Sequence, residues 1–202
     1  MTNKLSFIRE REELRYTMKM MYDRKLTNSA GGNAAVLVDE NLMLMTPSMM
    51  AEHKYCDLKI EDLLLVDFDL NILEGEGEIS REAMMHVHLL REFDYIKATV
   101  HAHPQFAMVY AAQSKPIPTM TDFTVKKGDC GVVEYAKAHT PELAKNVWDY
   151  FETKRELAEK MPLAAVLPRH GVICTGNSLT AAYCMLERLE TDALCGLFRD
   201  VI

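Results

Sequence analysis

The sequence lacks any long hydrophobic run. No uninterrupted apolar segment approaches the roughly 18 residues that a membrane-spanning helix needs. Residues 1–11 mix charged side chains with few apolar ones, so they do not carry the continuous apolar stretch of a secretory signal. We therefore expect neither a membrane protein nor an exported one, and the sequence predicts a cytoplasmic location.

Paired cysteines and an excess of positive charge are also absent. The five cysteines are scattered and contain no CxxC pair, which is typical of reduced thiols in a cytosolic protein. Lysine and arginine number 23 against 30 aspartates and glutamates, a net charge of -7. Because nucleic acids and anionic membranes bind basic surfaces, both are disfavoured as partners, and an anionic substrate would have to be bound by local groups.

What the sequence does contain is the composition of a globular protein. Hydrophobic residues make up 49% of the 202 residues and charged residues 26%, which is enough to build one substantial core. There is no internal repeat, linker or low-complexity tract. We therefore predict a single domain over residues 1–202.

Hydrophobic periodicity and turn residues predict interleaved helices and short strands. Helices are expected from an N-cap at Ser6 to about residue 25, from an N-cap at Ser80 to about residue 93, from Thr140 and Pro141 through residue 151, and after a cap at Asn177 or Ser178. Strands are expected at residues 34–38, 42–46, 63–68, 98–103 and 164–174. The short connection at residues 39–41 favours an antiparallel hairpin, so the prediction is a layered α/β fold whose sheet is not purely parallel.

Three histidines are candidate metal ligands. His101 and His103 alternate along one predicted strand, so their side chains project to the same face, as two ligands of one metal require. On its own such a pair is more often one hydrogen-bonded core histidine and one solvated one. His170 strengthens the case because it lies in another apolar segment, where an unpartnered imidazole would be costly. Three imidazoles suit a catalytic zinc site that keeps one coordination position open.

Glu82 is the candidate acid/base. It falls near the start of a predicted helix, where a carboxylate can be oriented and can alternate between metal ligand and base. The alternative is a first-turn glutamate that only favours the helix dipole.

Taken together, these motifs resemble the class II aldolase/adducin family. The elements that carry the resemblance occur in order along nearly the whole chain: Gly31-Gly32-Asn33, Met45-Thr46-Pro47-Ser48, Glu82 with His86 four residues on, Val100-His101-Ala102-His103, and His170-Gly171-Val172 followed by Gly176. The resemblance implies a three-layer α/β/α fold around a largely antiparallel sheet. It also implies a homotetramer with active sites at subunit interfaces.

The same resemblance assigns roles to residues. His101, His103 and His170 correspond to zinc ligands, with cobalt or manganese as alternative metals, and Glu82 corresponds to a fourth ligand that doubles as acid/base. A phosphate pocket falls on Gly32, Asn33, Ser48, Met49, Ser80 and Arg81. Hydroxyls, an amide and backbone N–H groups near a helix N-terminus suit a phosphate dianion.

Three positions depart from the family pattern. The family commonly has glycine where this chain has Met49 and serine where it has Arg81. Arg81 either adds an anion contact or points to solvent. Asp122 lies where some relatives place a tyrosine, and it is either a proton-transfer group or a turn-forming residue.

The function implied is reversible aldol cleavage of a ketose 1-phosphate, of the fuculose or ribulose type, to dihydroxyacetone phosphate and an aldehyde. Asp122 motivates an alternative reaction at the same metal site, namely 4-epimerisation, dehydration or decarboxylation of a sugar phosphate. A third alternative is a non-catalytic, adducin-like binding module.

Overall fold

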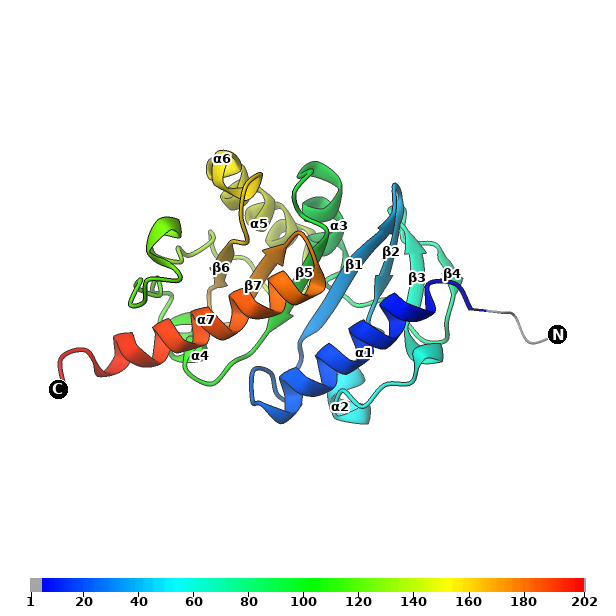
Figure 1. The fold of residues 1–202 in the computed structure, drawn as a ribbon, viewed down its shortest axis with the longest axis horizontal. Coiled ribbons are helices and arrows are strands. Elements are labelled where there is room, and N and C mark those ends of the chain that lie inside the picture. The colour runs from blue at the N-terminus through cyan, green and yellow to red at the C-terminus, as the bar shows by residue number, and fades with distance from the viewer. Residues whose placement is uncertain (1–4, 202) are drawn as a thin grey trace.

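A seven-stranded sheet forms the middle of the molecule (Figure 1). The computed structural model describes residues 5–201. The strands follow the order β4-β3-β2-β1-β5-β7-β6, and every pairing between them is antiparallel. Their bounds are β1 Asn33–Asp39, β2 Leu42–Met45, β3 Leu64–Asp67, β4 Ile72–Glu74, β5 Ala98–Ala102, β6 Ala164–Leu167 and β7 Gly171–Gly176. The prediction of a largely antiparallel sheet is confirmed.

Helices cover both faces of this sheet. Figure 1 shows α1 and α7 crossing one face, with α3, α5 and α6 on the other side. The helices are α1 Ile8–Asp23, α2 Met50–Lys54, α3 Ala83–Glu92, α4 Ala107–Ala112, α5 Pro141–Thr153, α6 Arg155–Ala158 and α7 Leu179–Phe198, with 3₁₀ turns at η1 Ile60–Asp62 and η2 Val125–Lys127. The three-layer α/β/α arrangement is therefore confirmed. Among the described residues, no helix is both long and apolar enough to span a membrane.

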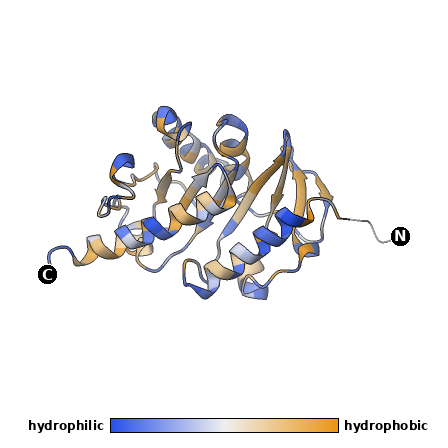
Figure 2. Cartoon of the chain, viewed as in Figure 1, coloured by the Kyte–Doolittle hydropathy of each residue, from blue (hydrophilic) through white to orange (hydrophobic). Residues whose placement is uncertain are grey.

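Side-chain alternation in the strands divides the interior into two hydrophobic cores. Ala34 and Val100 belong to the core beneath α1 and α7, whereas Ala35 belongs to the core beneath α3 and α5. Figure 2 shows hydrophobic residues along the strands and mixed hydropathy along the helices, as expected when each helix buries one side against the sheet. The two cores account for why the strands are hydrophobic on both faces.

Strand register gathers polar side chains on the α3/α5 face. Asn33 of β1 pairs with His101 of β5, and Ala35 pairs with Thr99. Since residues two apart on a strand share a face, Asn33, Thr99 and His101 lie on the same side as Ala35. This register places the polar side chains in the centre of the sheet.

Several predicted boundaries are wrong. The segment 164–174 is a hairpin rather than one strand, because Pro168 cannot donate a strand hydrogen bond and Arg169 turns the chain at φ 58°. Ser6 does not cap α1: Phe7 occupies that position in the left-handed conformation, and the Ser6 N–H donates to Glu74.

The start of α3 also differs from the prediction. The helix begins at Ala83 with Glu82 as its N-cap residue, and the Ser80 hydroxyl accepts a hydrogen bond from the Glu82 N–H instead of capping the helix itself. By contrast, Thr140 and Ser178 do cap α5 and α7. Helices α2, α4 and α6 and strand β4 were not predicted, because all are six residues or shorter and show little periodicity.

Candidate metal and active site

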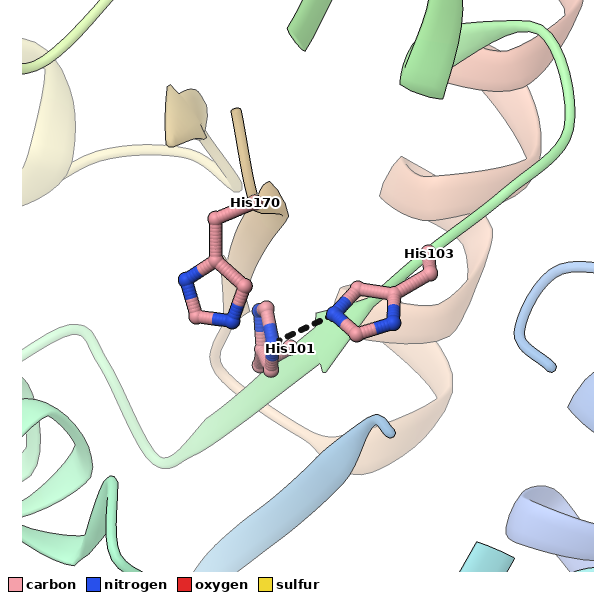
Figure 3. A group of neighbouring side chains, drawn as sticks. All are labelled: His101, His103 and His170. Carbon is pink, nitrogen blue, oxygen red and sulfur yellow. Dashed lines mark hydrogen bonds between the residues drawn. The ribbon is translucent and has the colours of Figure 1, made fainter. Parts of the chain in front are cut away.

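Three histidines from two distant segments of the chain converge (Figure 3). His101 lies in β5, His103 follows that strand directly, and His170 lies in the turn between β6 and β7. The Nε2 atoms of His101 and His103 are 3.1 Å apart. The ring centroid of His170 lies 4.6 Å from that of His101 and 5.4 Å from that of His103. The predicted cluster is therefore present, although His170 occupies a turn and not a strand.

Two glycines leave the space that the imidazoles fill. A Cβ on Gly171 would lie 2.6 Å from Cδ2 of His103 and 2.5 Å from the carbonyl oxygen of Ala102. A Cβ on Gly31 would lie 2.8 Å from Cε1 of His103. All three distances are shorter than real Cβ contacts. The packing of His103 therefore requires glycine at both positions.

His101 and His103 are neutral, and the lone pair of His101 is oriented. His101 Nδ1 lies 2.9 Å from the carbonyl oxygen of Val172, so Nδ1–H donates there and the Nε2 lone pair faces the other imidazoles. Burial lowers the pKa of His101 to about 4 and that of His103 to about 3. Both rings are therefore uncharged at neutral pH, which is the form that binds a metal.

Glu82 lies beside the histidines. Its Oε1 atom is 3.0 Å from His170 Nε2, and its Oε2 atom is 3.4 Å from His101 Nε2. Burial alone would raise the pKa of this carboxyl. The facing imidazoles of His101 and His170, together with hydrogen bonding, outweigh burial, so the net pKa lies well below its usual range. Glu82 is therefore a carboxylate.

Two buried polar atoms of this cluster have no hydrogen-bonding partner. Within residues 5–201, neither Glu82 Oε1 nor His170 Nδ1 makes a hydrogen bond. Such atoms are rare in folded proteins unless another group occupies the site. Three imidazoles, one carboxylate and an unsatisfied carboxylate oxygen fit a divalent cation, and these residues can hold one.

The predicted phosphate-binding residues line a cleft next to the histidines. The predicted residues on its walls are Gly32, Asn33, Ser48, Met49, Ser80 and Arg81, and they are joined there by Glu82, His103 and His170. The structure therefore brings this predicted set together, with Arg81 at an exposed position.

Gly32 and Met49 in the cleft wall share an unusual backbone conformation. Gly32 has φ 106°, and a Cβ there would lie 2.4 Å from Thr27 Oγ1, so glycine is required. Met49 has φ 60°, in the left-handed region that favours glycine. The backbone thus keeps the conformation that suits the family's glycine although the residue is methionine.

Asn33 also contacts the candidate acid/base. Its side chain is buried, and its Nδ2 donates to Glu82 Oε2 at 2.8 Å while its Oδ1 faces His86 Nε2. The amide therefore contacts the candidate acid/base more directly than it contacts the open cleft.

Asp122 is not brought to the histidines. It is exposed, in a loop before η2, and it is not among the residues that line the cleft. The loop is tied to α7 by the buried Asp192, which accepts hydrogen bonds from the Met120 N–H and the Thr124 hydroxyl.

Sequence reasoning assigned no role to two further histidines. His86 is fully buried behind Asn33, and only its spacing from Glu82 had marked it. His139, which precedes α5 with φ 66°, lines the cleft, and its ring centroid lies 6.1 Å from that of His170. No sequence motif points to His139.

Comparisons with known proteins agree with this geometry. The L-fuculose phosphate aldolase of Methanococcus maripaludis is 30% identical over 178 residues, covering 87% of this chain and 89% of that protein. A 3-oxo-tetronate 4-phosphate decarboxylase of Haemophilus influenzae is 28% identical over 181 residues, covering 87% and 80%. A solved structure of an L-fuculose 1-phosphate aldolase matches with a TM-score of 0.83 at 29% identity, covering 98% of this chain and 89% of the other.

The family assignment rests on almost the full length of the chain. The family model described as "Class II Aldolase and Adducin N-terminal domain" matches residues 12–196. Together with relatives named as aldolases, this match confirms the prediction of an aldolase-type lyase. The chain therefore belongs to the class II aldolase and adducin N-terminal domain family.

Proposed function

We propose that this protein is a zinc-dependent aldolase that reversibly cleaves a ketose 1-phosphate to dihydroxyacetone phosphate and an aldehyde. The proposal is carried by two neighbouring features: a carboxylate among three imidazoles, and a cleft beside them that contains anion-binding groups. A sugar phosphate needs both a site for its reacting carbons and a separate site for its phosphate.

The metal would be held by His101, His103 and His170, with Glu82 alongside. When bound, zinc would polarise the substrate carbonyl and stabilise the negative charge left when the carbon–carbon bond breaks, an effect of several kcal/mol. Cobalt or manganese could serve in its place. No Schiff-base lysine is needed.

The phosphate would bind at the opposite side of the cleft. Ser48 and Ser80 supply hydroxyls, Gly32 allows close approach of the backbone, and the N-terminus of α3 lies next to Ser80. Backbone N–H groups at a helix N-terminus favour a dianion. Arg81 would add a charged contact, which offsets the negative charge of the whole chain.

Proton transfer would involve two groups. In the condensation direction, the Glu82 carboxylate would take a proton from the triose carbon that attacks the aldehyde, and a second group would give a proton to the aldehyde oxygen, which becomes a hydroxyl. Cleavage reverses both transfers, and proton exchange with water restores the two groups. One proton leaves the substrate and one returns, so the products carry no net change. We assign the transfer of the hydroxyl proton to Asp122 of a neighbouring subunit, because Asp122 does not line the cleft of its own chain.

This assignment depends on assembly. We propose a cytoplasmic homotetramer with sites at subunit interfaces, which light scattering of the purified protein would test. A monomer with full activity would contradict the assignment of Asp122.

The activity is tested by offering fuculose 1-phosphate and ribulose 1-phosphate and following release of dihydroxyacetone phosphate. We expect release that is lost after chelation and restored by zinc, cobalt or manganese. The matched control is the His101→Gln variant, which should not respond to added metal. Full activity without metal, or no triose from either sugar, would contradict the proposal.

The relative named as a decarboxylase supports a second candidate reaction. The same site could epimerise, dehydrate or decarboxylate a sugar phosphate. Carbon dioxide release from a 3-oxo acid phosphate, or epimer formation from ribulose 5-phosphate, without triose release would favour this candidate. An adducin-like binding role would instead be indicated if the gently purified protein contains no transition metal.

A further inference from the structure

A chain of buried polar side chains lies behind Glu82. Thr99 Oγ1 is 2.6 Å from His86 Nδ1, and His86 Nε2 contacts Asn33 Oδ1. Asn33 Nδ2 is then 2.8 Å from Glu82 Oε2. These residues come from β5, α3 and β1, so the chain of contacts joins three elements at the centre of the α3/α5 face.

The direction of every hydrogen bond in this chain follows from the charge on Glu82. A carboxylate only accepts, so the Asn33 amide must turn its NH₂ group toward Glu82 and its carbonyl toward His86. His86 Nε2 must then carry a proton and donate it to that carbonyl. A neutral imidazole has one proton, so His86 Nδ1 accepts from the Thr99 hydroxyl.

Burial makes this arrangement rigid. His86 and Thr99 are fully buried and Asn33 nearly so, which removes water as an alternative partner. Burial also lowers the pKa of His86 to about 4, so the ring stays neutral, with one donor and one acceptor. If the amide flipped, two oxygens would face each other in a dry environment, which is unfavourable because neither can donate a hydrogen bond.

We propose that His86, backed by Thr99, is a positioning residue that fixes the Asn33 amide and, through it, the Glu82 carboxylate. The amide holds Oε2, and Oε1 is left without a hydrogen bond and next to His170. One oxygen of the acid/base is thereby anchored and the other is free to act. The catalytic part of this inference rests on the proposed function of Glu82.

The first test reads the tautomer of His86 directly. In protein labelled with ¹⁵N-histidine, a ¹H–¹⁵N correlation spectrum should show the His86 proton on Nε2. The Asn33 carbonyl should keep the proton on Nε2 in both Thr99 variants. Thr99→Ser keeps the hydroxyl and should keep the Nδ1 signal, whereas Thr99→Val removes the donor to Nδ1 and should shift or broaden the Nδ1 signal. A proton on Nδ1 in the unaltered protein would overturn the proposal, whatever reaction the enzyme catalyses.

The second test separates the two nitrogens of His86. The amide of His86→Gln can replace Nε2 and keep the contact with Asn33, whereas His86→Asn can replace Nδ1 only and loses it. We expect His86→Asn and Thr99→Val to lower kcat for triose release about 10- to 100-fold with little change in KM, and His86→Gln and Thr99→Ser to stay within about threefold. Substitution of His88, which is on the same helix outside the site, should have no effect.

Equal losses in His86→Gln and His86→Asn would overturn the proposal, because they would show that the ring matters only as a space-filling group. Metal content and unfolding midpoints of all variants should be measured in parallel. A loss of activity that follows loss of folded protein would also count against positioning. If the unaltered enzyme releases no triose, the proposed function fails, while the tautomer measurement still decides the positioning of Glu82.

Discussion

Glu82 combines burial with negative charge, and that combination defines its chemistry. Neutralising its side chain without changing its shape should remove proton transfer and leave binding intact. We expect Glu82→Gln to lower kcat by about 100-fold or more with a small change in KM. Steady-state kinetics with metal analysis would check this, with the exposed Glu76→Gln as control. Retention of normal kcat would exclude Glu82 as acid/base.

Met49 is the second residue with a specific consequence, because its backbone already has the conformation that glycine prefers. We expect Met49→Gly to tighten binding of inorganic phosphate about fivefold, the gain of about one hydrogen bond to an uncovered backbone N–H. Competitive inhibition by phosphate would measure it. Met49→Ala removes most of the side chain but keeps the Cβ, so it should give a smaller gain.

The sequence predicts the candidate metal ligands better than it predicts the residues that form hydrogen bonds with them. His101, His103, His170 and Glu82 stand out because alternation and motif order mark them. The contact of Asn33 with Glu82 could not be foreseen, because it depends on the register of β1 against β5 and on the entry of α3. His139 carries no motif, and only the path of the loop before α5 places it in the cleft.

Among the elements, the β6–β7 hairpin sets the position of His170. Gly171 allows the hairpin to pack directly against the backbone of Ala102, because a Cβ at this position would collide with it. We expect Gly171→Ala to reduce the free energy of unfolding by about 1–3 kcal/mol and to weaken metal binding, because His103 and the turn must move apart. Denaturant titration and metal titration would measure the two effects.

A substitution in the same turn provides the control for Gly171→Ala. Arg169 already has positive φ, so Arg169→Gly adds no atoms and relieves backbone strain. Its metal affinity should match that of the unaltered protein. Equal damage from both substitutions would show that any change in the turn disrupts the site.

The hairpin also shows where element prediction fails. The apolar residues on both sides of Pro168 suggest one long strand, and only the proline and the pairing of Leu167 with Gly171 reveal two. The cap at Ser6 failed for a different reason, because Phe7 takes the N-cap position in the left-handed conformation, while the Ser6 N–H donates to Glu74, 68 residues away in the sequence. Local patterns predicted the long helices, whereas tertiary contacts decided where several elements begin.

For the whole molecule, the buried histidines link stability to pH. His86, His101 and His103 have pKa values lowered to about 4, 4 and 3, whereas an unfolded histidine has a pKa of about 6.5. As pH falls below about 6.5, the unfolded chain binds protons that the folded chain does not, so stability present at neutral pH is lost. The lowered pKa of Glu82 acts in the same direction.

We therefore expect metal-free protein to lose more than about 3 kcal/mol of unfolding free energy between pH 7 and pH 4. Urea titrations at a series of pH values would measure the slope. A His101→Gln, His103→Gln double variant should show a shallower dependence, since two of the titrating groups are gone. An unchanged slope in that variant would show that other groups govern acid unfolding.

The division of the interior by the sheet has a wider consequence. The buried polar side chains that β1 and β5 contribute to the site lie on the face toward α3 and α5, while the strand side chains that face α1 and α7 are apolar. Substitutions should therefore be tolerated unequally. Aliphatic side chains that face α1 and α7 should accept others of similar volume, whereas substitutions of the polar residues on the other face should disrupt the site. A designer who wishes to make this enzyme more robust has one side of the sheet to work on.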